Sequence, residues 1–183
     1  MGNKPYIIAI DPGNKESAYC LCSPDLKPLA FAKLRNVEGK KQVFWNAICD
    51  SLSEHVQEGD EIRFVIEDMQ NFGMPVGRSV LDTEKYIGYL TCLIETNGYA
   101  VDYVFRNEEK LILCHSMKAN DATIKQALID RFAPDTSNHG KGTKACPGFF
   151  YGMKNDCWSA FAQCVTFHDR EYGSDLHLEE LPF

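Results

Sequence analysis

The chain has 183 residues, 44% of them apolar, and a formal net charge of −7 at pH 7. This length and apolar content fit a folded domain with a full-sized core and exclude a mainly disordered chain. The apolar runs are shorter than the roughly 18–20 residues that cross a membrane, and the first residues lack the pattern of a secretion signal, so we expect a cytoplasmic protein without a membrane segment.

The first part of the chain predicts three strands and a helix. Residues 5–11, 17–23 and about 28–35 are short apolar segments separated by turn residues, which is typical of strands in hairpin order. The first segment is apolar almost throughout, as in a strand buried on both faces, and it ends in Asp11-Pro12-Gly13. Between residues 39 and 57, apolar side chains recur at helical spacing, which predicts an amphipathic helix.

The rest of the chain alternates strands and helices. Residues 62–68 and 99–105 predict strands, and residues 80–96 and 122–132 predict helices, the second of them capped by Asp121. A loop follows over residues 134–148, and a last helix begins near residue 155. Hairpin strands are antiparallel, whereas strands joined by helices return parallel. We therefore predict an α/β fold with a mixed five-stranded sheet flanked by helices.

The eight cysteines are scattered through apolar stretches of a chain without a secretion signal. We therefore expect buried thiols and no disulfides. An alternative is a zinc site made from Cys146, Cys157, Cys164 and His168, although only the last two are closely spaced, whereas structural zinc sites usually combine two close pairs.

Three carboxylates lie at comparable positions in the predicted fold. Asp11 ends the first strand, Glu67 ends the fourth, and Asp156 begins the last helix. Adjacent parallel strands bring such ends together at one edge of a sheet. Converging acids repel one another, and a divalent cation relieves the repulsion; with oxygen ligands alone, Mg²⁺ or Mn²⁺ is expected. Paired ions of this kind catalyse phosphodiester hydrolysis.

Each carboxylate also has a simpler interpretation, which the residues alone leave open. Asp11 can be a turn residue that bonds its own backbone, and Asp156 can be a helix cap. Asp68 competes with Glu67, because alternation along a strand sends the two side chains to opposite faces. The functional interpretation therefore depends on the three carboxylates acting together.

Three stretches resemble motifs of the RuvC-like Holliday junction resolvases, within the RNase H-like superfamily. They are IIAIDPGNKESAYCLC (7–22), FVIEDMQNFG (64–73) and KACPGFFYGMKNDCWSAFAQCVTFHD (144–169), the last being similar to the C-terminal block of phage-type members. The resemblance implies one RNase H-like nuclease domain over residues 1–183, with an acidic tail from about 169 to 183. It also implies that Asp11, Glu67 and Asp156 are catalytic residues and ligands of Mg²⁺ or Mn²⁺.

The same resemblance implies an endonuclease that cuts four-way DNA junctions by a two-metal-ion mechanism. Symmetric cutting of two strands suits a homodimer. The helix at 80–96 is a candidate for the dimer interface, and packing on the sheet is the alternative. The family commonly has a fourth acid within one helical turn of the third, but Met153 and Ser159 occupy the candidate positions here. We therefore regard Asp68 and Ser159 as candidate supports for the second cation.

Several residues are candidates for contacts with DNA. The net negative charge argues against a nucleic-acid partner, but the acids crowd the C-terminal end, and local potential decides binding. Exposed lysines are often only solvated, and an isolated aromatic residue often belongs to the core. The candidates are Lys154, Lys118, Lys125, Lys141 and Lys144 for phosphates, and Phe72 for stacking on an unpaired base.

Other functions stay open at this point. One is an RNase H-like nuclease that acts on structured RNA. Another is a catalytically weak or inactive protein that binds junctions, which the missing fourth acid favours. A third is an ATP-binding protein of the actin-like class, which also begins with a strand ending in Asp-x-Gly; the single copy of the module in this chain argues against it.

Overall fold

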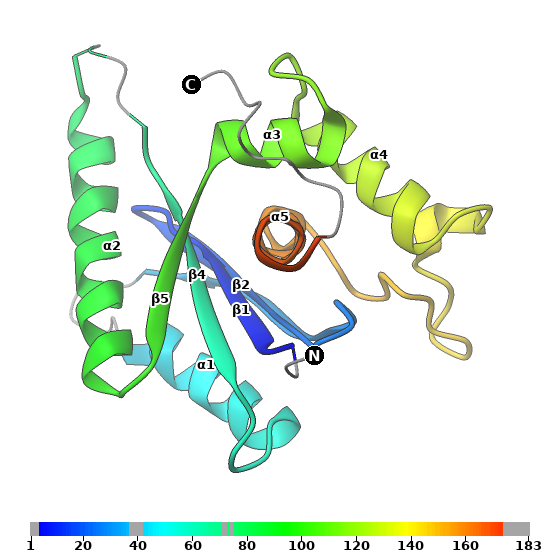
Figure 1. Ribbon diagram of the computed structural model, residues 1–183, viewed down its shortest axis with the longest axis horizontal. Helices are drawn as coiled ribbons and strands as arrows, with labels where there is room; N and C mark the ends of the chain where they lie inside the picture. Colours follow the sequence, from blue (N-terminus) through cyan, green and yellow to red (C-terminus); the bar gives the residue numbers. More distant parts are fainter. Residues whose placement is uncertain (1–3, 37–41, 71–72, 74, 174–183) are drawn as a thin grey trace.

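The computed structural model describes residues 4–36, 42–70, 73 and 75–173, and its strands form one sheet in the order β3-β2-β1-β4-β5 (Figure 1). The strands are β1 (Tyr6–Asp11), β2 (Glu16–Cys22), β3 (Pro28–Arg35), β4 (Ile62–Asp68) and β5 (Ala100–Phe105). β1, β2 and β3 pair antiparallel, whereas β4 lies parallel to β1 and β5 parallel to β4. The predicted mixed sheet is confirmed.

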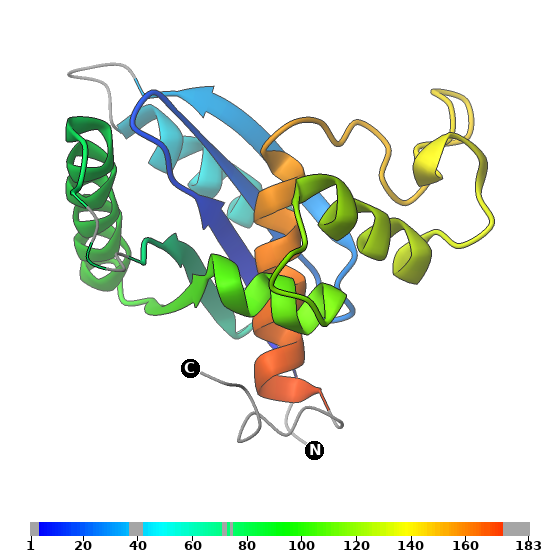
Figure 2. The ribbon, with the colours of Figure 1, turned by 90° about the horizontal axis from the view of Figure 1, so that it is seen from above.

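Helices cover both faces of this sheet (Figures 1 and 2). α1 (Gln42–His55) and α2 (Arg78–Thr96) lie on one face, and α5 (Cys157–Tyr172) crosses the other, beside α3 (Arg106–Cys114) and α4 (Asp121–Phe132). A 3₁₀ turn, η1 (Ser137–Gly140), lies in the loop after α4. Within the described ranges, every helix is too short or too polar to cross a membrane.

β1 is buried from both sides, which explains its nearly continuous apolar sequence. Ile8 and Ile10 belong to the core under α1 and α2, whereas Ile7 and Ala9 belong to the core under α5. Side chains alternate along a strand, so Asp11 follows Ile7 and Ala9 toward α5. The strand therefore delivers its carboxylate to the face covered by α5.

α2 packs on the sheet, which was the alternative to a role in the dimer interface. Tyr86, Leu90 and Ile94 are buried in the core, while Leu81 is 49% exposed on another side of the helix. The role of α2 in a homodimer stays a prediction.

Two helices differ from the sequence prediction. α3 was not predicted, because it begins at Arg106, directly after β5 ends at Phe105, without a turn residue between them. The predicted cap of α4 is wrong: Asn120 is the cap, and its Oδ1 accepts a hydrogen bond from the Thr123 backbone nitrogen at 3.0 Å. Asp121 is thereby left to interact elsewhere.

Residues 169–172 belong to α5, and the predicted acidic tail from residue 174 onward lies outside the described residues.

All cysteines are free, as predicted. The prediction that the thiols are buried is wrong for Cys92 and Cys146, which are exposed. The three thiols that lie within 4.8 Å of one another belong to Cys20, Cys22 and Cys164, so the proposed zinc group does not form within the described ranges.

Candidate active site

Asp11 and Glu67 end two neighbouring parallel strands. Ile10 of β1 pairs with Ile66 of β4, so the next residue in each strand is the carboxylate. Gln163 of α5 shows which way Glu67 points, because its Nε2 donates a hydrogen bond to Glu67 Oε2 at 2.9 Å. The two predicted ligands therefore share the face of the sheet that α5 covers.

The turn after Asp11 requires a glycine. A Cβ at Gly13 would lie 2.3 Å from the backbone oxygen of Glu16. Ser17 holds the turn, since its Oγ accepts hydrogen bonds from the Gly13 nitrogen at 3.2 Å and from Asn36 Nδ2 at 2.9 Å. Asp11-Pro12-Gly13 thus anchors the end of β1, and the glycine is needed for the approach of the chain to β2.

Asp156 precedes α5, but its side chain makes no capping hydrogen bond to the helix. Its Oδ2 instead pairs with Lys33 Nζ of β3 at 2.8 Å, and the same Nζ pairs with Glu16 Oε2 at 2.7 Å. Lys33 is thus a residue of the site that the sequence analysis missed. Its ion pair turns Asp156 toward the sheet, where the Asp156 charge acts on Asp11.

The candidate supports of the second cation lie in different places. Asp68 lines the cavity that contains Asp11 and Glu67. Alternation along β4 directs its side chain toward the opposite face, and its Oδ1 accepts a hydrogen bond from the Met69 nitrogen at 2.8 Å. Ser159 lines the same cavity as Asp156, one turn further along α5. Met153 is completely buried in the core. The support roles of Asp68 and Ser159 stay predictions.

α3 contributes two charged residues that the sequence analysis missed. Arg106 forms ion pairs with Glu109 and with Asp121, and Glu109 is buried. The start of the helix carries a local signal, because Glu108 Oε2 accepts a hydrogen bond from the Phe105 nitrogen at 2.7 Å. A glutamate three residues after the end of a strand could have indicated a helix start at Arg106.

The carboxylates at this edge of the sheet hold their protons unusually tightly. Burial, followed by the charges of Glu67 and Asp156, raises the pKa of Asp11 to about 7, although Arg106 and Lys33 oppose the rise. Burial and then the charge of Glu109 raise the pKa of Glu67 to about 7. The acids therefore act on one another, as groups that attract a cation do.

No protein-family model matches the sequence, and no curated protein matches it. The structure is similar to that of Thermus thermophilus RuvC in complex with a Holliday junction substrate, with a TM-score of 0.62 and 12% identity over 92% of this chain and 97% of that one. A second Thermus thermophilus RuvC structure gives a TM-score of 0.59 and 14% identity over 91% and 96% of the two chains. The fold is RuvC-like. This confirms the fold that the three sequence motifs predict.

In this RuvC-like fold, the donor atoms suit a hard divalent cation, since Asp11, Glu67 and Asp156 all offer carboxylate oxygens. Their oxygens do not close into a compact set: over the part of the chain that the structure describes, no three acidic groups have ligand atoms within 4.8 Å of one another. Asp156 forms an ion pair with Lys33, and the positive charge of Arg106 acts on Asp11 and Glu67. The three carboxylates suit a cation because they offer oxygen ligands and because a cation would relieve the repulsion among their charges.

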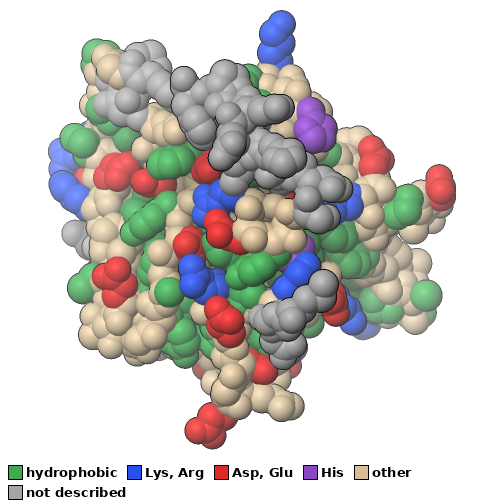
Figure 3. Space-filling view, viewed as in Figure 1, with side chains coloured by type: hydrophobic (Ala, Val, Ile, Leu, Met, Phe, Trp, Pro, Cys, Tyr) green, Lys and Arg blue, Asp and Glu red, His purple; other side chains and the backbone are tan. Residues whose placement is uncertain are grey.

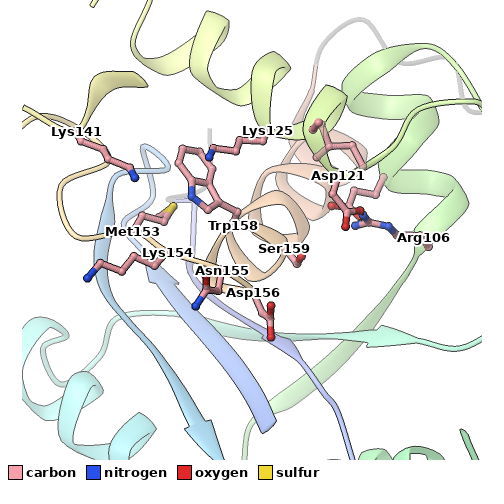
Figure 4. Close-up of a pocket in the computed structure, with 13 residues that line it drawn as sticks. Arg106, Asp121, Lys125, Lys141, Met153, Lys154, Asn155, Asp156, Trp158 and Ser159 are labelled. Carbon is pink, nitrogen blue, oxygen red and sulfur yellow. Dashed lines mark hydrogen bonds and ion pairs between the residues drawn. The ribbon is translucent and has the colours of Figure 1, made fainter. Parts of the chain in front are cut away.

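Three of the predicted phosphate-binding lysines line the cavity beside Asp156 (Figure 4). They are Lys125, Lys141 and Lys154. Lys125 Nζ lies 4.8 Å from the centre of the Trp158 ring, which fixes its position through a cation–π contact. Figure 4 shows these lysines on one side of the start of α5 and Arg106 with Asp121 on the other.

The remaining candidates for DNA contacts are less connected to the site. Lys118 and Lys144 are exposed and do not line this cavity, and Phe72 lies outside the described residues. On the face of the molecule seen in Figure 3, acidic and basic side chains are interspersed. The cavity beside Asp156 is therefore the best-defined place for basic side chains to meet a phosphate.

Proposed function

We propose that this chain is a metal-dependent, structure-selective endonuclease that hydrolyses phosphodiesters in branched DNA, as in a four-way junction. The observation that carries the proposal is the placement of Asp11, Glu67 and Asp156, which come from three elements of a RuvC-like fold and share one electrostatic field at the ends of β1 and β4. The similarity to a RuvC structure that contains a Holliday junction substrate supports this class of substrate.

The three carboxylates would hold Mg²⁺ or Mn²⁺, which supply an activated water and stabilise the departing oxygen in two-metal-ion hydrolysis. Gln163 positions Glu67 through its hydrogen bond from the buried side of α5. Lys33 neutralises part of the charge of Asp156 and keeps its carboxylate at the sheet. The protein thus orients the acids with neighbours from β3 and α5, as preorganised sites do.

Contacts with DNA would come mainly from the wall of the cavity beside Asp156. We assign Lys125, Lys141 and Lys154 to phosphates, because they line the cavity beside Asp156 on one side of the start of α5. Lys118, Lys144 and Phe72 are further candidates. Symmetric cutting of a junction requires two active sites, so we propose a homodimer in which residues 1–183 form one nuclease domain in each subunit.

The test is nicking of a labelled synthetic four-way junction with Mg²⁺ or Mn²⁺. Asp11→Asn should abolish nicking and leave junction binding intact in a gel-shift assay, because it removes a cation ligand and no contact with DNA. Asp25→Asn is the matched control, since Asp25 is exposed in the turn between β2 and β3 and should nick normally. Equal nicking by Asp11→Asn and the unaltered chain would remove the assignment.

Two other functions are outcomes of the same experiment. Tight binding of the junction without nicking in either metal would indicate a junction-binding protein without catalysis, which the buried thioether of Met153 favours, because it occupies a candidate position of the fourth acid. Cleavage of structured RNA, and its competition with the junction, would indicate an RNA nuclease of the same fold.

A further inference from the structure

α3 carries a buried carboxylate, and within the described part of the chain one of its two oxygens makes no hydrogen bond that would stabilise the fold. The Glu109 side chain is 1% exposed; its Oε2 pairs with Arg106, and among the described residues its Oε1 has no hydrogen-bond partner. Burying a carboxylate oxygen without a partner costs stability, and an apolar residue would avoid the cost. In this arrangement the oxygen is buried and has no partner in the described ranges, a cost that a bound cation would remove.

The position of Glu109 points to the proposed cation site. Glu109 lines the same cavity as Asp156. Of the charged groups that raise the pKa of Glu67, Glu109 has the largest effect, and Asp11 in turn raises the pKa of Glu109. α3 continues directly from β5, the neighbour of β4 in the sheet. Its carboxylate therefore shares a cavity with Asp156 and acts electrostatically on the acids that end β1 and β4.

We propose that Glu109 supplies the fourth carboxylate of the cation site, from α3 instead of from the start of α5. The inference rests on the proposed nuclease function and adds one ligand to the same site. It explains how Met153 and Ser159 can occupy the positions next to Asp156 where a fourth acid was expected: the negative charge is provided by another helix.

Arg106 is the group that Glu109 would exchange for a cation. Its guanidinium pairs with both Glu109 and Asp121, and it belongs to the linings of two cavities, one containing Asp156 and the other containing Asp11 and Glu67. Asp121 is 88% exposed. Arg106 can therefore keep a partner at the surface when Glu109 turns to a cation.

The test is direct binding of Mn²⁺ to the full chain, measured by electron paramagnetic resonance of the free ion. Glu109→Gln should weaken Mn²⁺ binding by about tenfold or more, since even residues that only support a metal ligand contribute about 10–100-fold to affinity. Asp11→Asn sets the scale of a lost ligand. Glu95→Gln is the matched control, because Glu95 is exposed near the end of α2 and its removal should change nothing.

A second pair of variants guards against misfolding of Glu109→Gln, which leaves Arg106 without a buried partner. Arg106→Gln should bind Mn²⁺ more tightly than the unaltered chain, and Arg106→Gln/Glu109→Gln should lose at least about tenfold relative to Arg106→Gln. If both Glu109 variants bind Mn²⁺ as their parents do while Asp11→Asn does not, Glu109 is only a structural partner of Arg106. If the unaltered chain binds no Mn²⁺, the proposed function itself fails.

Discussion

Replacing Asp11 with asparagine should stabilise the protein at alkaline pH when chelator is present. Burial and the charges of Glu67 and Asp156 raise the pKa of Asp11 from 3.8 to about 7. The folded state thus keeps a proton that the unfolded chain releases, so the contribution of this group to stability is full below pH 3.8 and is lost as the pH rises through about 7. Since one pKa unit corresponds to about 1.4 kcal/mol, ionised Asp11 costs the folded state up to about 4 kcal/mol.

Urea unfolding in EDTA, followed by circular dichroism at about pH 5 and about pH 8.5, measures this cost. The free energy of unfolding of the unaltered chain should fall between the two pH values, and that of Asp11→Asn should fall less. Asp25→Asn should behave like the unaltered chain. Mn²⁺ should then stabilise the unaltered chain more than Asp11→Asn, because the variant lacks one of the cation ligands. Equal stability of Asp11→Asn and the unaltered chain at the higher pH would refute the reasoning.

Two further predictions concern positioning and DNA contacts. Gln163→Leu removes the hydrogen bond to Glu67 Oε2 and should reduce nicking about tenfold with unchanged affinity for the junction; normal nicking would show that Glu67 needs no such support. Lys154→Ala should weaken junction binding and lower the slope of log affinity against log salt by about 1, whereas Lys27→Ala, in the exposed turn between β2 and β3, should change neither; an unchanged slope would place Lys154 away from phosphates.

The sheet could be predicted from the sequence because its central strand is buried on both faces. The apolar run from Ile7 to Ile10 is typical of an internal strand. The helical segments between the later strands predict crossovers that return those strands parallel. The end of each such strand is then a sharp boundary, so Asp11 and Glu67 stand out as charged residues directly after apolar ones. The placement of these two acids followed from this pattern alone.

The contribution of α3 to the site could not be found in the same way. The helix begins without a turn residue after Phe105, and its charged start resembles a solvent-exposed segment. Glu109 is nevertheless buried, because Arg106 beside it supplies a counter-charge. Patterns of polarity place charged residues at the surface. They cannot reveal a charged residue that is buried together with its ion-pair partner, such as Glu109 with Arg106. Nor can they reveal an ion pair between residues far apart in the sequence, such as Lys33 and Asp156.

α5 joins the hydrophobic core to the chemistry of the site. It is among the most deeply buried helices, with Ala160, Phe161 and Val165 completely inaccessible, and it also carries Gln163 and follows directly from Asp156. A methyl group added or removed beneath this helix would shift its axis and displace both Asp156 and Gln163, the hydrogen-bond partner of Glu67. Under the proposed function, cleavage therefore constrains the volume of side chains that never approach DNA.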